Sequence, residues 1–110
     1  MPSNDYYVIA YKLLKYLYDS LKNGKPPDMG TVCAEFFGIN EEYWQYILRT
    51  LYDEGYIAGI YMNSSVERKP YATRLNEIEI TPKGIQYLNE NSMFQKIKGA
   101  VKDIADILPI

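Results

Sequence analysis

The sequence predicts an α+β fold, in which a core of three helices carries a β-hairpin and two further helices follow. An amphipathic helix stops at Gly55, and a strand rich in β-formers begins directly after it. A turn of two residues, Gly38 and Ile39, separates that helix from the one before it, which indicates a helix-turn-helix. Downstream, residues 76–80 alternate between apolar and acidic side chains, as a strand with one buried face does.

Composition limits the class of protein. The 110 residues are 47% hydrophobic, which is enough for one domain with a single core. The formal net charge is −2, so any nucleic-acid site must be a local basic patch rather than the whole surface. A single cysteine, Cys33, excludes an internal disulfide, and no apolar run reaches the length of a membrane span. We therefore expect a cytoplasmic protein without a membrane partner.

The first helix is expected to begin at a cap, Ser3 or Asn4, and to run to about Lys22. Gly24 and the two prolines that follow it end the helix. Its apolar residues should face inward and its lysines should face solvent. The inward residues are Ala10, Leu13, Leu14, Leu17 and Leu21, and the outward residues are Lys12, Lys15 and Lys22.

The second and third helices have their own start signals. Asp28 is a suitable cap for a helix over residues 29–37, whose apolar side is Val32, Cys33, Phe36 and Phe37. Asn40 caps the third helix, and Ile39 and Trp44 have the spacing of a hydrophobic staple. The apolar face of this helix consists of Trp44, Ile47, Leu48 and Leu51, and Tyr56, beyond the glycine, should pack on Leu51.

Residues 56–62 and 76–80 are expected to pair as antiparallel strands, with residues 63–75 as a long loop, the wing. Thr81 and Pro82 are typical of a helix start, which places a fourth helix over residues 82–90. Ser92 and Gln95 have the form of a capping box before a last helix, whose apolar stripe is Phe94, Ile97, Val101, Ile104 and Leu108. We thus expect one domain over residues 1–92 and an amphipathic helix over 93–110, which either packs on that domain or forms a homodimer seam.

The order of these elements, with Glu-Gly-Tyr-Ile at residues 54–57 and Ile-Thr-Pro-Lys-Gly at 80–84, resembles the winged helix-turn-helix superfamily over about residues 5–90. The opening Asp-Tyr-Tyr at residues 5–7 and the run from 56 to 85 resemble, more narrowly, the YjcQ family of small bacterial and phage proteins. This resemblance implies a winged-helix fold and a phage or prophage connection, and it supplies no established active residues.

Catalysis is not expected. The chain has no histidine, and Cys33 therefore has no imidazole to activate it, so we interpret Cys33 as a buried apolar residue. Neighbouring acids such as Glu41 and Glu42 do not face each other on a helix. We expect a protein that is not an enzyme and that needs neither a cofactor nor a metal.

Two binding functions remain open. In a winged helix, the third helix and the wing contact double-stranded DNA, for which the candidate residues are Gln45, Arg49, Thr50, Arg68, Lys69 and Arg74. Residues 41–54 carry four acids and one arginine, however, which opposes phosphate contact. The alternative is a protein-interaction or phage assembly module without DNA binding, in which Tyr43 and Tyr46, beside acidic residues, or the C-terminal seam contact a protein partner. The 12 tyrosines are interpreted as residues of a small domain that pack their rings and keep their hydroxyls in water, with an interface or a base-stacking surface as the other interpretation.

Overall fold

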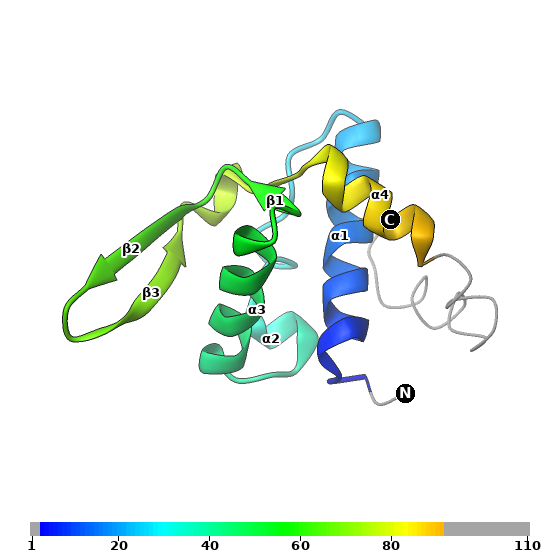
Figure 1. The fold of residues 1–110 in the computed structure, drawn as a ribbon. Coiled ribbons are helices and arrows are strands. Elements are labelled where there is room, and N and C mark those ends of the chain that lie inside the picture. Colours follow the sequence, from blue (N-terminus) through cyan, green and yellow to red (C-terminus); the bar gives the residue numbers. More distant parts are fainter. Residues whose placement is uncertain (1–2, 92–110) are drawn as a thin grey trace.

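The computed structural model describes residues 3–91, and within this part it is an α+β fold, as predicted (Figure 1). Four α-helices are joined to two small antiparallel sheets of two strands each in the described residues. The elements are α1 (Tyr6–Lys22), α2 (Ala34–Phe37), α3 (Glu41–Asp53), β1 (Ile57–Ala58), β2 (Tyr61–Ser65), β3 (Arg68–Thr73), a 3-10 helix (Leu75–Glu77), β4 (Glu79–Ile80) and α4 (Pro82–Glu90). The predicted last helix, with Phe94, Ile97, Val101, Ile104 and Leu108, lies outside the described residues.

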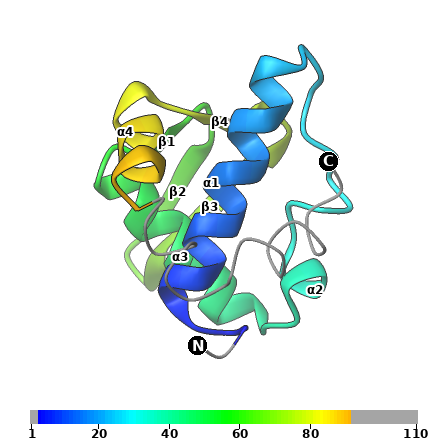
Figure 2. The ribbon, with the colours of Figure 1, turned by 90° about the vertical axis from the view of Figure 1, so that its right-hand side faces the viewer.

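Helix α1 forms the centre of the helical part, with α3 and α4 packed against it (Figures 1 and 2). Ile9, Leu13 and Leu14 on α1 are completely buried, as are Ile47 and Leu48 on α3. Burial of such side chains is worth roughly 1.5–3 kcal/mol each, so this contact between two helices supplies much of the core.

Three expectations for α1 were wrong. Asp5 caps the helix instead of Ser3 or Asn4, since its carboxylate accepts a hydrogen bond from the Tyr7 N–H at 3.2 Å. Lys12 is only 4% exposed, so it does not lie on the solvent side of the helix. Leu21 is 55% exposed because the last turn of α1 projects beyond the other helices (Figure 2).

The second helix is shorter than predicted. Asp28 caps a turn rather than a helix, with its side chain accepting from the Gly30 N–H at 3.1 Å. Glycine and the two β-branched residues after it weaken helix formation, and Cys33 takes an extended conformation before the single turn of α2. Cys33 is half-buried rather than buried, and its thiol donates to the Gly30 carbonyl at 3.3 Å.

Both ends of α3 agree with the prediction. Asn40 Oδ1 accepts from the Tyr43 N–H at 2.8 Å. Gly55 has φ +81°, and the Tyr56 N–H reaches the Leu51 carbonyl at 2.9 Å, which together with the Gly55 N–H bond to Tyr52 is a Schellman cap. The chain therefore leaves α3 in a fixed direction and enters β1 at once.

The prediction of paired strands was right for β1 and β4, and the prediction of a loop between them was wrong. β1 and β4 pair antiparallel with Ile57 opposite Ile80, as expected. The predicted loop over residues 63–75 is instead mostly a second hairpin, β2 with β3, which extends away from the helices (Figure 1). The polar residues of this segment favoured a loop in the sequence. In the structure, polar side chains bond across the hairpin, since Asn63 Nδ2 donates to Thr73 Oγ1 at 2.9 Å. Both strands of a two-stranded sheet are edges, so Pro70 is tolerated there.

Helix α4 begins as predicted and packs closely on β1. Thr81 Oγ1 accepts from the Gly84 N–H at 3.1 Å and donates to the Gly55 carbonyl at 2.6 Å. A Cβ added at Gly84 would lie 2.5 Å from the Tyr56 carbonyl oxygen, so only glycine permits this approach. Among the helices described over residues 3–91, none combines the length and apolar character needed to cross a bilayer.

Candidate functional site

Two grooves flank α3, one on each side. The hairpin groove, of about 580 Å³, lies between α3 and β3 and is lined by Glu41, Glu42, Gln45, Tyr46, Arg49, Arg68, Lys69, Pro70 and Tyr71. The tyrosine groove, of about 490 Å³, lies between α1, α3 and α4 and is lined by Tyr6, Tyr7, Ala10, Tyr43, Tyr46, Leu51, Glu54, Tyr56 and Tyr87. Tyr46 borders both grooves, so α3 is their common wall.

The hairpin groove brings together four of the six residues that the sequence suggested for DNA contact: Gln45, Arg49, Arg68 and Lys69. Arg49 Nη1 donates to the Pro70 carbonyl at 3.4 Å, which directs this guanidinium from α3 toward the hairpin. The Arg68 guanidinium lies 4.2 Å from the centre of the Tyr71 ring, a cation–π contact that holds it on the hairpin surface. The three cations of the groove thus come from two elements.

Acidic residues form part of the same groove. Glu41 and Glu42 occupy the first turn of α3, where carboxylates are stabilised by the helix dipole. The groove is therefore lined by three cations and two carboxylates, with positive charge concentrated toward the hairpin.

Gln45 has a structural role that the sequence did not reveal. Its Oε1 accepts from the Ala72 N–H at 2.6 Å, and its Nε2 lies 3.4 Å from both the Ala72 carbonyl and Glu41 Oε2. The carboxamide therefore joins α3 to β3. A residue that makes these bonds has less hydrogen-bonding capacity left for a ligand.

Thr50 and Arg74 lie away from the hairpin groove. The Thr50 hydroxyl is 2.7 Å from the Tyr6 hydroxyl and also bonds the Tyr46 carbonyl, so it faces α1. Arg74 has φ +59° at the base of the hairpin, with its guanidinium 6.0 Å from the centre of the Tyr61 ring. No local pattern indicates that these two residues face away from the groove.

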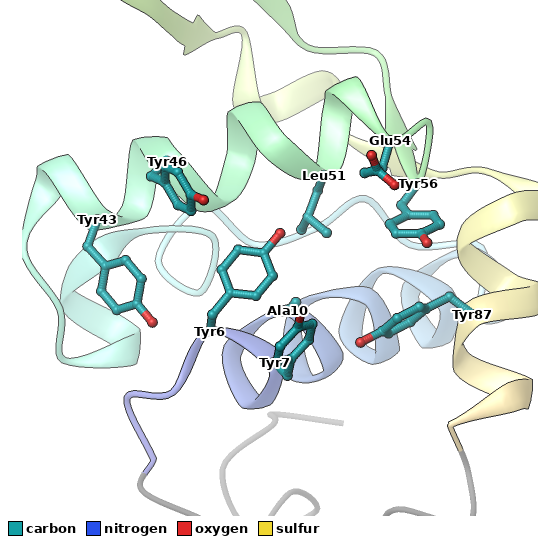
Figure 3. Close-up of a pocket in the computed structure, with 9 residues that line it drawn as sticks. All are labelled: Tyr6, Tyr7, Ala10, Tyr43, Tyr46, Leu51, Glu54, Tyr56 and Tyr87. Atoms are coloured by element: carbon teal, nitrogen blue, oxygen red, sulfur yellow. The ribbon is translucent and has the colours of Figure 1, made fainter.

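The tyrosine groove collects six of the 12 tyrosines of the chain (Figure 3). Tyr6 and Tyr7 from α1 pack edge to face, with ring centres 5.1 Å apart. Tyr56 and Tyr87, at the start of β1 and on α4, form a second pair, also 5.1 Å apart. Figure 3 shows the hollow between the two pairs, bordered by Ala10 and Leu51. The sequence interpretation favoured ordinary packing of the tyrosines, and the sequence could not show that half of them cluster.

Burial raises the pKa of three tyrosines of this groove, Tyr6, Tyr43 and Tyr87, above the ordinary value of a phenol. Burial, with a smaller contribution from Tyr56, raises the pKa of Tyr87 to about 12. Burial also raises the pKa of Tyr6, against the opposing effect of its hydrogen bond to Thr50. Glu54 is the one charged residue that lines the groove, so the surface is apolar and aromatic with a single carboxylate.

A metal centre is not formed by the described part of the chain. Across residues 3–91, no three histidine, cysteine, aspartate or glutamate side chains lie close enough to hold an ion. This part offers open grooves to a ligand, and the two that flank α3 hold the candidate residues named above.

The fold and its two grooves define a small α+β domain with a β-hairpin beside an amphipathic helix. The chain belongs to the YjcQ protein family, whose model matches residues 11–107. It is similar to "Uncharacterized protein YjcQ" of Bacillus subtilis (strain 168), with 28% identity over 98 residues, which cover 89% of this chain and 92% of the relative. No solved structure matches the chain.

Proposed function

We propose that this protein is a winged-helix module that contacts duplex DNA with its hairpin and the adjoining edge of α3. The order of elements supports this assignment, since a short helix and a tight turn precede α3 and a hairpin follows it. The observation that carries the proposal is the convergence of Arg49, Arg68 and Lys69 on one groove. Guanidinium and ammonium groups are the usual partners of DNA phosphates.

The distribution of charge suggests how the contact is made. Arg68 and Lys69 are exposed on the hairpin, where they would meet phosphates, and Arg49 would lie between the hairpin and α3. Glu41 and Glu42 would repel phosphates, so the N-terminal turn of α3 would stay outside the contact unless a carboxylate accepts from a cytosine amino group. Gln45 would hold the hairpin in place rather than read a base.

The test is duplex binding as a function of salt, with the variant Arg68→Ala plus Lys69→Ala. We expect affinity to fall steeply with salt, and the double variant to lose about tenfold or more at low salt with a salt slope reduced by about 2. The matched control is Lys22→Ala plus Lys25→Ala, which removes the same charge at the far end of α1. Equal losses in both variants, or no binding at low salt, would overturn the proposal.

The second candidate is a protein-interaction module, including a phage structural or assembly role. It is supported by the tyrosine groove, because tyrosine is enriched where proteins meet and the groove gathers half of the tyrosines of the chain. In this case the chain would not bind duplex DNA at low salt. If the protein partner is a second copy of the chain, a molar-mass measurement in solution should show a dimer.

A further inference from the structure

We propose that the tyrosine groove is the docking site of residues 92–110 of the same chain. The groove has a large apolar surface at its rim, since Tyr7 is 62% exposed and Tyr46 is 48% exposed in the described part. An aromatic surface of this kind is normally covered by another element. This inference concerns the opposite side of α3 from the hairpin groove and stands independently of DNA binding.

The position of α4 is the first argument for this occupant. Tyr87 lines the groove, and the helix ends one turn later at Glu90 (Figure 3). The chain therefore leaves α4 at the border of the groove, and the next 19 residues begin beside it. As a helix these residues would extend about 28 Å, whereas α1, which forms one wall, has 17 residues.

The second argument is the pattern of the segment itself. Its apolar side chains follow one another at intervals of three and four residues, which places them on one face of a helix. They are Phe94, Ile97, Val101, Ile104 and Leu108. The family model extends through residue 107, so it includes all of the stripe but Leu108 together with the groove residues on α3 and α4. A stripe of this width needs an apolar partner, and the groove at the end of α4 supplies one.

Charge is compatible with this occupant. Glu54 is the charged residue of the groove, and the segment carries three lysines, Lys96, Lys98 and Lys102, against two aspartates, Asp103 and Asp106. The neutral phenols of Tyr6 and Tyr87 accept an apolar neighbour without an ionic cost near neutral pH. The sequence alone left open whether the stripe packs on its own domain or on another copy. The groove favours the first.

The experiment uses the full chain with Cys33→Ser, which keeps a donor for the Gly30 carbonyl, and a spin label on Lys102→Cys. Ring signals of isotope-labelled tyrosines are then recorded by NMR. We expect strong broadening of Tyr7, Tyr56 and Tyr87, and little effect on Tyr61 on the hairpin. The matched control carries the label on Ser64→Cys in the hairpin, which should reverse this pattern.

A mixed sample separates the two possible partners. Isotope-labelled chain without the spin label is combined with spin-labelled chain at natural abundance, so that any broadening arises between copies. Broadening in this sample would assign the groove to a second copy and overturn the proposal, as would no broadening of the groove tyrosines in either sample. Ile97→Asp plus Val101→Asp should abolish the effect, and Gln95→Asp plus Gly99→Asp, which add the same charge at positions outside the apolar stripe, should preserve it.

Discussion

Gln45 pairs with the backbone of Ala72 much as a neighbouring strand would. Its carboxamide oxygen accepts from the Ala72 N–H at 2.6 Å, and its carboxamide nitrogen lies 3.4 Å from the Ala72 carbonyl. Ala72 faces Met62 across the hairpin, so the side chain of Gln45 covers the edge of β3 that β2 does not. A helix and a hairpin that are far apart in sequence are thereby held at one angle.

Gln45→Leu should loosen the hairpin. The change leaves the half-buried backbone groups of Ala72 without their partner, at a cost of about 1–3 kcal/mol in the free energy of unfolding. Denaturant unfolding measures this loss, and hydrogen exchange should be faster at the Ala72 amide. The control is Gln86→Leu, where the carboxamide bonds only the exposed Glu90 and the change should stay within about 0.5 kcal/mol. Equal effects in both variants would contradict this role.

Gly84→Ala should destabilise the protein, although alanine normally favours a helix by about 1 kcal/mol over glycine. The added Cβ would lie 2.5 Å from the Tyr56 carbonyl oxygen and 2.7 Å from Ile80 Cγ1, so α4 has to move away from β1. Overpacking of this kind costs about 1–3 kcal/mol, which thermal or denaturant unfolding will detect. At Gly30 the new Cβ would come no closer than 3.6 Å to its neighbours, so Gly30→Ala serves as the neutral comparison.

Thr81→Ala should cost more than Thr81→Ser. The hydroxyl accepts from the Gly84 N–H and donates to the Gly55 carbonyl, so it both caps α4 and joins it to the end of α3. Losing an N-cap costs about 0.5–2 kcal/mol, and serine keeps the same hydroxyl. Urea unfolding of the two variants provides the comparison. If both lose the same stability, the missing methyl group rather than the hydroxyl explains the effect.

Tyr87 should make the stability depend on pH in the alkaline range. Burial raises its pKa from 10.0 to about 12, so the unfolded chain loses this proton first. The stabilisation is complete below pH 10 and is lost as the pH rises from 10 to about 12. Ultraviolet titration of the phenolates should show a last ionisation near pH 12 in the folded protein. Tyr87→Phe should remove it, and Tyr61→Phe should leave it in place.

Helix ends could be predicted from the sequence because their signals are local. Asn40, Gly55 and Thr81 each act within four residues of their own position, and all three cap as expected. The same reasoning predicted a helix cap at Asp28. The glycine and the β-branched residues after it disfavour a helix, so this segment forms a turn and α2 begins later, at Ala34. Local signals therefore fail where neighbouring propensities oppose them.

The hairpin and the two grooves depend on contacts between distant residues. Asn63 was interpreted as a loop residue. Its hydrogen bond to Thr73 crosses the hairpin, and the residues next to Asn63 in sequence do not indicate it. Lys12 was expected to face solvent, as lysines on an amphipathic helix usually do, and the local pattern gives no sign that it is buried. The tyrosine groove is built from residues of α1, α3, the start of β1 and α4, so composition alone could not reveal it.

Because Ile57 pairs with Ile80 at the base of the hairpin, the hairpin can vary in length at its other end. This pair closes the chain at the foot of the hairpin, while the turn at Val66 and Glu67 lies at the opposite tip. Residues inserted there four at a time, two on each strand, would preserve the alternation of faces and leave the base of the hairpin unchanged. The reach of the hairpin can therefore change by whole rungs, while the helical core retains its packing.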